Sequence, residues 1–213
     1  MNMITGVPYN FSFTAASLRP ELARIVAECY RAEGGDWADA KERVLTTNAL
    51  QAGSAVSAVR LEREFRSRLA TLSEEQLTIL ADAPAEDRAA IAWLAAMKRS
   101  RFLFDFAAEM LREKLAQRDP VLRPSDYEHF VGMKLPLHPE LGRLTPSSRE
   151  KVRRTLLHML EEAGILLDRS PKGRSLGTVR RPVLSPAVVQ SIVADDRRWL
   201  AGFLVPDAEI ETL

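Results

Sequence analysis

The residues of this sequence with the most evident chemistry are cationic side chains gathered in its last third. Residues 145–181 contain nine lysines and arginines against four acidic residues, whereas the whole chain of 213 residues has a formal net charge of only +1. A surface that binds phosphate groups requires such a local excess of positive charge. The basic residues are Arg149, Lys151, Arg153, Arg154, Arg169, Lys172, Arg174, Arg180 and Arg181. We therefore expect this region to contact a polyanion.

An amphipathic helix is expected to carry the first part of this charge. Thr145 and Pro146 are typical of a helix start, and Gly164 is typical of the residue that follows a helix end. Between residues 149 and 163 the apolar side chains fall within one arc of about 100° on a helical wheel. These side chains are Val152, Leu156, Met159, Leu160 and Ala163.

The opposite face of this helix has basic residues first and acidic residues last. Lys151 and Arg154 lie near its beginning, and Glu161 and Glu162 lie at its far end. A recognition helix inserts its N-terminal half into the major groove of DNA, which suits this order of charges. We expect Lys151, Arg154 and the nearby Ser148 to approach the groove.

A basic turn between two short β-compatible segments follows the helix. The segments are residues 165–167 and 178–181, and the turn spans residues 169–174. Helix, strand, basic turn and strand follow one another in this order in a winged helix-turn-helix. The alternative is an ordinary helix and hairpin with a solvated basic face. The cations of the turn, which we expect on the DNA backbone beside the groove, are Arg169, Lys172 and Arg174.

A second basic surface is expected on a helix that Ser54 caps and that runs to Leu72. This helix follows two shorter ones, as in a second helix-turn-helix, and its outward arginines are Arg60, Arg63 and Arg66. The alternative interpretation is a solvated helix, because Glu62 with Arg66 and Glu64 with Arg68 have the i,i+4 spacing of surface ion pairs.

Nothing in the sequence indicates an enzyme, a metal site or a cofactor. The three histidines, at positions 129, 138 and 158, are scattered, and no His/Cys pair has metal-ligand spacing. The sequence has neither a phosphate-binding glycine loop nor a G-x-S-x-G turn. We expect a non-enzymatic protein that binds no cofactor and no metal.

The cellular location is expected to be the cytoplasm. The single Cys29 excludes an internal disulfide and is expected to be a buried structural thiol. No signal peptide is evident at the N-terminus. The longest apolar run, Ala89 to Met97, is about half of the roughly 18 residues that a membrane-spanning helix needs.

The apolar pattern predicts a mainly α fold, a helical bundle with an N-terminal helix-turn-helix-like part and a C-terminal winged-helix-like part with a small β-hairpin. Proline-containing dipeptides at Asp119-Pro120 and Arg123-Pro124 suggest two domains, residues 1–120 and residues 121–213. A break is expected near Arg99-Ser100. The first 16 residues are expected to form a short strand or an arm pinned onto the body.

Several segments, in order and spacing, resemble the BrxA family of bacterial BREX phage-defence systems. The resemblance covers about residues 9–205 and fades at 169–180 and after Pro206. The segments that carry it are Phe11 to Leu18, Asp36-Trp37, Asn48-Ala49-Leu50, Ser57 to Glu64, Arg68-Leu69, Leu111 to Lys114, Asp126 to Phe130, His138 to Leu141 and Leu160 to Leu166.

The resemblance implies a small helical protein without catalytic residues that binds double-stranded DNA. Its partners would be other BREX components, such as the methyltransferase and the ATPase. The family has also been likened to the RNA-binding antitermination factor NusB, so RNA is an alternative ligand. A third possibility is an adaptor whose winged helix docks another defence protein.

Overall fold

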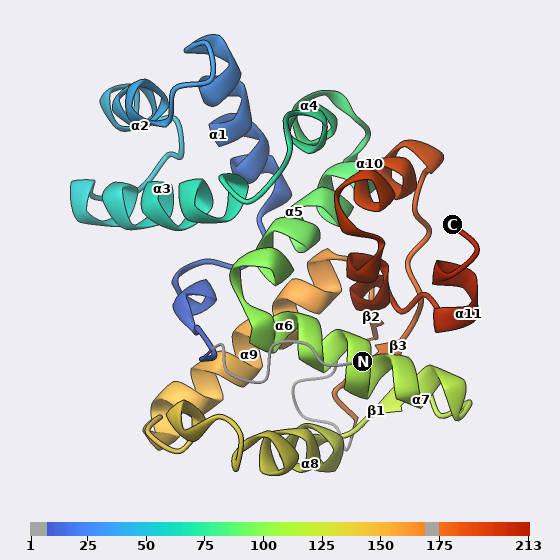
Figure 1. The fold of residues 1–213 in the computed structure, drawn as a ribbon. Helices are drawn as coiled ribbons and strands as arrows, with labels where there is room; N and C mark the ends of the chain where they lie inside the picture. The colour runs from blue at the N-terminus through green and yellow to red at the C-terminus, as the bar shows by residue number, and fades with distance from the viewer. Residues whose placement is uncertain (1–7, 169–174) are drawn as a thin grey trace.

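The computed structural model describes residues 8–168 and 175–213, which form helices and one small antiparallel sheet that lies among the elements of the second half (Figure 1). The fold is mainly α, as the sequence predicts. The helices of the first half surround α5 (Ala85–Arg99), in which every residue from Ala90 to Met97 is buried. The helices packed against α5 are α1 (Pro20–Ala32), α3 (Ala55–Leu69) and α4 (Glu74–Asp82), whereas α2 (Trp37–Thr46) packs on α1 and α3.

Several helices, among them α2, α3 and α4, begin at a residue whose side-chain oxygen accepts from free N–H groups of the first turn. The Asp36 carboxylate accepts from the N–H of Ala38 at 2.6 Å, and the Ser54 hydroxyl accepts from the N–H of Ser57 at 3.2 Å. A reciprocal capping box joins Ser73 and Gln76. The expected break near Ser100 is also present.

The break at Ser100 separates α5 from a second helical run that carries the structure into its second half. This run consists of α6 (Arg101–Asp105), the π-helical η2 (Phe106–Leu111) and α7 (Arg112–Ala116). Phe106 of this run packs edge-on against Phe130, with ring centroids 5.1 Å apart.

The second half has a sheet of three strands between its helices. In chain order the elements are β1 (Val121–Leu122), α8 (Pro124–Lys134), η3 (Pro139–Leu141), α9 (Pro146–Glu162), β2 (Leu166–Leu167), β3 (Gly177–Val179), α10 (Pro186–Asp196), η4 (Arg197–Phe203) and α11 (Asp207–Ile210). The strand order is β1-β3-β2 and both pairings are antiparallel.

The strand β1 is not evident in the sequence, because its two residues lie between the proline-containing dipeptides Asp119-Pro120 and Arg123-Pro124. Val121 pairs with Thr178, and Leu122 pairs with Gly177. A β-carbon at Gly177 would come within 2.7 Å of the Leu167 carbonyl oxygen, so the close approach of the strands requires glycine there. The division at residue 120 stays a prediction.

Lys114 ties α7 to the beginning of β1 and to α8. Its buried ammonium donates to Asp119 at 2.9 Å and lies 2.8 Å from Asp126. Together with Arg123, which donates to the same carboxylate, Lys114 lowers the pKa of Asp119 to about 2.

Replacing Lys114 by methionine is expected to lower the free energy of unfolding by about 1–3 kcal/mol, because two carboxylates lose a charged donor. Urea denaturation measures this change. Lys41→Met removes an exposed ammonium from α2 and should change stability by no more than about 0.5 kcal/mol. Equal effects of the two substitutions would contradict a structural role for Lys114.

Residues 8–16 form an arm packed on the body, and the predicted alternative of a short strand is wrong for this described part of the N-terminal segment. The Asn10 side chain accepts from the N–H of Ser12 at 2.7 Å and so begins the 3-10 turn η1 (Ser12–Ala15). The Tyr9 ring stacks on His138 at 3.6 Å, and its hydroxyl donates to Asp105 at 2.8 Å. The arm therefore contacts both halves of the chain.

Candidate nucleic-acid interface

The helix α9 presents the charge pattern that the sequence predicts. Thr145 caps it by accepting from the N–H of Ser148 at 3.2 Å. All the apolar side chains predicted for one face are buried, and Leu157 is buried with them. The helix is thereby held against β2 and η1, and its opposite edge remains accessible.

Lys151 and Arg154 lie on this accessible edge. Arg154 is exposed and Lys151 is half-buried. Among the residues that the structure describes, no carboxylate lies within ion-pair distance of either one. Two neighbouring cations of this kind can donate hydrogen bonds to phosphate oxygens.

Ser148 is near these cations, but its hydroxyl takes part in the helix cap. It accepts from the Thr145 hydroxyl at 2.9 Å. Its side chain is half-buried in the first turn of α9. The structure therefore gives Ser148 a role in starting the helix, whatever else it contacts.

The accessible edge of α9 faces the N-terminal arm across a shallow groove. The sequence analysis did not identify this second wall, because nothing in the spacing of residues predicts that the arm lies beside α9. The residues that line the groove are Thr14, Ala15, Ala16, Ser17 and Arg19 on the arm, and Lys151, Arg154, Thr155 and His158 on α9.

The acidic end of α9 fixes the arm in place. One oxygen of Glu162 accepts from the N–H of Leu18 at 2.7 Å, and the other accepts from the N–H of Arg19 and the hydroxyl of Ser17, both at 3.1 Å. His158 lies 3.3 Å from Glu161 and 3.9 Å from Glu162. Glu162 is therefore occupied by donors of the arm.

The basic turn predicted to bind DNA backbone, with Arg169, Lys172 and Arg174, lies outside the described residues. The strands on either side of it pair as predicted, Leu166 with Val179 and Leu167 with Thr178.

Part of the charge excess counted in the sequence is neutralised by neighbouring acids. Arg153 donates to Glu150 at 2.7 Å, and both terminal nitrogens of Arg181 donate to Glu209 of α11. These two arginines are less available to a polyanion than the sequence analysis assumed. For Arg181 the reason is that Glu209 is distant in sequence and comes close only in the folded chain, whereas Glu150 lies one helical turn before Arg153.

The second predicted basic surface, on α3, divides into exposed and engaged arginines. Arg60 and Arg63 are exposed. Arg66 is partly buried and donates to Glu62 at 2.6 Å, so its guanidinium is held by a carboxylate. One oxygen of Glu62 is buried without a hydrogen-bond partner among the described residues.

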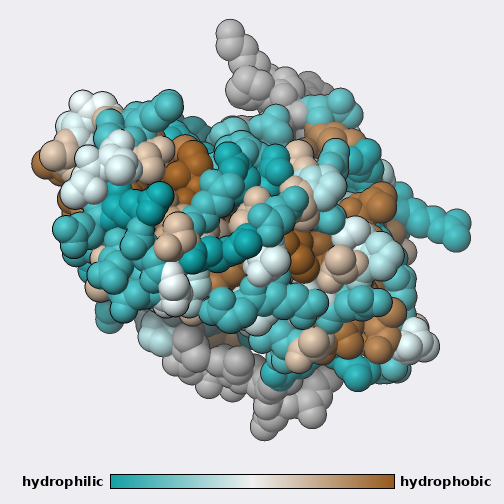
Figure 2. All heavy atoms as spheres, turned by 90° about the horizontal axis from the view of Figure 1, so that it is seen from above, coloured by the Kyte–Doolittle hydropathy of each residue, from teal (hydrophilic) through white to brown (hydrophobic). Residues whose placement is uncertain are grey.

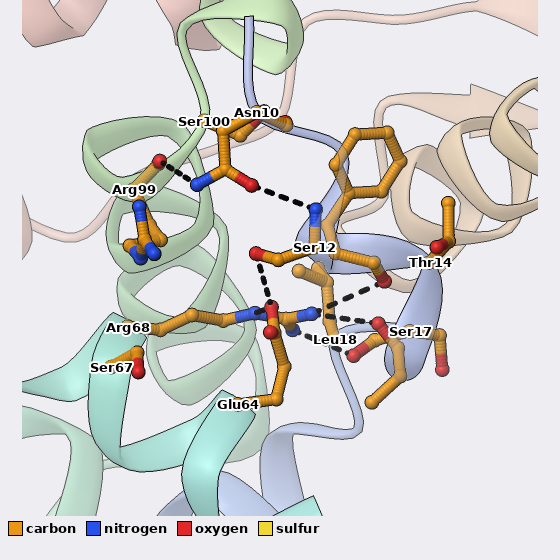
Figure 3. Close-up of polar contacts among 12 residues, drawn as sticks. Asn10, Ser12, Thr14, Ser17, Leu18, Glu64, Ser67, Arg68, Arg99 and Ser100 are labelled. Carbon is orange, nitrogen blue, oxygen red and sulfur yellow. Dashed lines mark hydrogen bonds and ion pairs between the residues drawn. The ribbon is translucent and has the colours of Figure 1, made fainter. Parts of the chain in front are cut away.

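Both i,i+4 pairs of α3 form, but the interpretation as solvated surface pairs is wrong. The pair of Glu64 and Arg68 is buried, with a separation of 2.9 Å. Arg68 also donates to the carbonyl oxygens of Ala16 at 2.7 Å and Ser17 at 2.8 Å (Figure 3). Burial lowers the pKa of the Arg68 guanidinium, and the Glu64 carboxylate opposes that shift.

The rest of the described surface has neither a metal-ligand cluster nor a membrane-spanning helix. On the face in Figure 2 hydrophilic side chains predominate, and the apolar ones form separate patches. Within residues 8–168 and 175–213, no group of three or more His, Cys, Asp or Glu side chains is arranged to hold a metal ion. No helix in the same ranges has the length and apolar character to cross a membrane. Cys29 is buried, as predicted.

Comparisons with known proteins identify relatives over most of the chain. It is 29% identical over 176 residues to a protein called BREX protein BrxA from Escherichia coli O9:H4 (strain HS), covering 82% of this chain and 80% of that one. It is 24% identical over 156 residues to a protein of the same name from Bacillus cereus (strain H3081.97), covering 73% and 76%.

A solved structure shares the fold. The crystal structure of an uncharacterized protein from Magnetospirillum magneticum has a TM-score of 0.76 with 21% identity, covering 93% of this chain and 98% of that one. The family model BrxA matches residues 7–196. The match spans almost the whole of the described fold, and the chain belongs to the BrxA family.

Proposed function

We propose that this protein is a non-enzymatic accessory protein of a BREX-type phage-defence system and binds double-stranded DNA through α9 and the basic turn after it. The observation that carries this proposal is the pair Lys151 and Arg154, accessible and without a carboxylate partner among the described residues. Their position in the N-terminal half of α9 suits insertion of that half into the major groove.

The order of elements in the second half supports a winged helix. Such a fold places a strand before the helix-turn-helix and a hairpin after it, with the first strand paired to the last. The segment β1-α8-α9-β2-β3 has this order, and its strands lie in the order β1-β3-β2. The basic turn joins β2 to β3, which is the position of the wing.

We assign a secondary role to α3. Its exposed Arg60 and Arg63 extend the cationic surface, whereas the guanidinium of Arg66 is held by Glu62 and contributes less. We place the protein in the cytoplasm, without a cofactor, beside other BREX components such as the methyltransferase and the ATPase. The relatives named BREX protein BrxA support this context.

A salt-titrated binding assay tests the proposed ligand. Duplex DNA, single-stranded DNA and structured RNA are titrated separately at equal salt, and affinity for the duplex is expected to be highest and to fall steeply with salt. Tighter binding of structured RNA would favour the RNA alternative. No measurable binding to any of the three would remove nucleic acid as the ligand.

The wing gives a prediction of its own. Replacing Lys172 and Arg174 by glutamate is expected to weaken binding to every duplex sequence alike, since phosphate contacts carry no base information. Fluorescence anisotropy with two unrelated duplexes of equal length measures this effect. Unchanged affinity would place the wing outside the interface.

A protein-docking adaptor is the second candidate, because large apolar side chains are exposed where α8 leads into η3. Met133 is 51% exposed, Leu135 44% and Leu137 64%. Exposed apolar side chains that cluster are typical of protein contact sites. Co-purification of a BREX component that fails when Leu135 and Leu137 become serine would favour this role.

A further inference from the structure

The groove between the arm and α9 has the composition of a channel for a nucleic-acid backbone. Among the nine residues that line it there is no carboxylate, and Arg19, Lys151 and Arg154 are cationic. The hydroxyls of Thr14 and Ser17 already donate to the Phe11 carbonyl and to Glu162. His158, which also lines the groove, lies against Glu161 and Glu162. The groups left to bind phosphate are therefore the three cations and the Thr155 hydroxyl.

On the arm side of the groove, the local structure does not explain why residue 19 is an arginine. It occupies the N-cap position of α1 with φ 42°, and its side chain makes no capping hydrogen bond. Asparagine, aspartate or glycine suits both a helix N-cap and a left-handed backbone better than arginine does. Arginine at this position has a strained backbone and contributes an exposed guanidinium to the groove.

We propose that the arm is part of the DNA-binding surface and that one strand's backbone lies in this groove, with Arg19 on a phosphate opposite Lys151 and Arg154. This inference rests on the proposed function and extends it to a segment far away in sequence. From residue 151 to residue 158 the helix rises about 10 Å. This length is sufficient for two consecutive phosphates of one strand.

The arrangement also gives Arg68 and Glu162 a positioning role. Arg68 donates to the carbonyl oxygens of Ala16 and Ser17, and Glu162 of α9 accepts from the N–H groups of Leu18 and Arg19. Neither residue lines the groove. Together they fix the distance between its two walls.

The test replaces Arg19 by asparagine, which keeps or improves the helix cap while it removes the cation. Stability is expected to be unchanged or higher. Duplex affinity is expected to fall about eightfold at 0.1 M salt, and the slope of log affinity against log salt should decrease by about 0.9, the value for one phosphate contact. Lys41→Asn, on α2, is the control for equal loss of charge and should leave the affinity and the slope unchanged.

The outcomes separate this inference from the function on which it rests. Unchanged affinity and slope in Arg19→Asn, with binding lost in Lys151→Glu/Arg154→Glu, would overturn the inference and leave the proposed function intact. Unchanged binding in both variants would overturn both. Equal losses of affinity in Arg19→Asn and Lys41→Asn would indicate that Arg19 acts only through the net charge of the protein. This result would also overturn the inference.

A cross-linking measurement gives an independent result. In a Cys29→Ala background, a thiol-reactive photo-crosslinker is placed at Ala15→Cys in the groove or at Ala38→Cys on the exposed side of α2. We expect covalent attachment to the duplex from position 15 and not from position 38. Attachment from neither position, or equally from both, would contradict a backbone path along the arm.

Discussion

The double substitution Lys151→Glu/Arg154→Glu is expected to lower the affinity for duplex DNA by about two orders of magnitude or more at 0.1 M salt. Each lost phosphate contact accounts for about eightfold at this salt, and the introduced carboxylates add repulsion. The helix itself should persist, because both side chains lie on the accessible edge of α9. Fluorescence anisotropy across a salt series measures the loss, and circular dichroism checks the fold.

The matched control for this variant reverses two cations elsewhere. Lys41 on α2 and Arg197 on η4 are exposed, and neither has an ion-pair partner among the described residues. Lys41→Glu/Arg197→Glu changes the net charge by the same amount. Equal losses in the two double variants would indicate that net charge alone governs binding, and no loss in the α9 variant would exclude α9 from the interface.

The largest effect on stability is expected from Arg68→Met. The substitution leaves Glu64 as a buried carboxylate without its partner and removes the donors to the carbonyl oxygens of Ala16 and Ser17. Breaking a buried ion pair in this way costs about 3–5 kcal/mol. Because a domain of this kind is stable by only about 5–15 kcal/mol, the variant should unfold at much lower denaturant concentration.

Two comparisons make the Arg68 prediction specific. The double variant Glu64→Met/Arg68→Met removes both charges and should recover part of the stability, because no unpaired buried carboxylate remains. Arg24→Met breaks a surface contact with Glu21 at 3.0 Å and should cost no more than about 1 kcal/mol. If Arg68→Met lowered the free energy of unfolding no more than Arg24→Met does, the packing of the arm would not depend on the buried pair. Limited digestion with chymotrypsin, which cleaves after Phe11 or Phe13 of the arm, reports release of the arm directly.

The local structure of this protein could be read from its sequence. The caps at Ser54 and Thr145 follow from short-range chemistry, in which a side-chain oxygen satisfies an N–H group three residues away. The buried face of α9 follows from helical periodicity. The strand β1 was missed because two residues are too few to show a period.

The sequence by itself therefore determined the fold class, the apolar and cationic faces of α9 and the family resemblance. Only the tertiary structure decided which charges are free, because an ion pair depends on neighbours that sequence spacing does not reveal. Arg181 meets Glu209, the pair of Glu64 and Arg68 is buried beneath the arm, and Glu162 holds Leu18 from 144 residues away. The groove beside Arg19 exists for the same reason, since its two walls come from opposite ends of the chain.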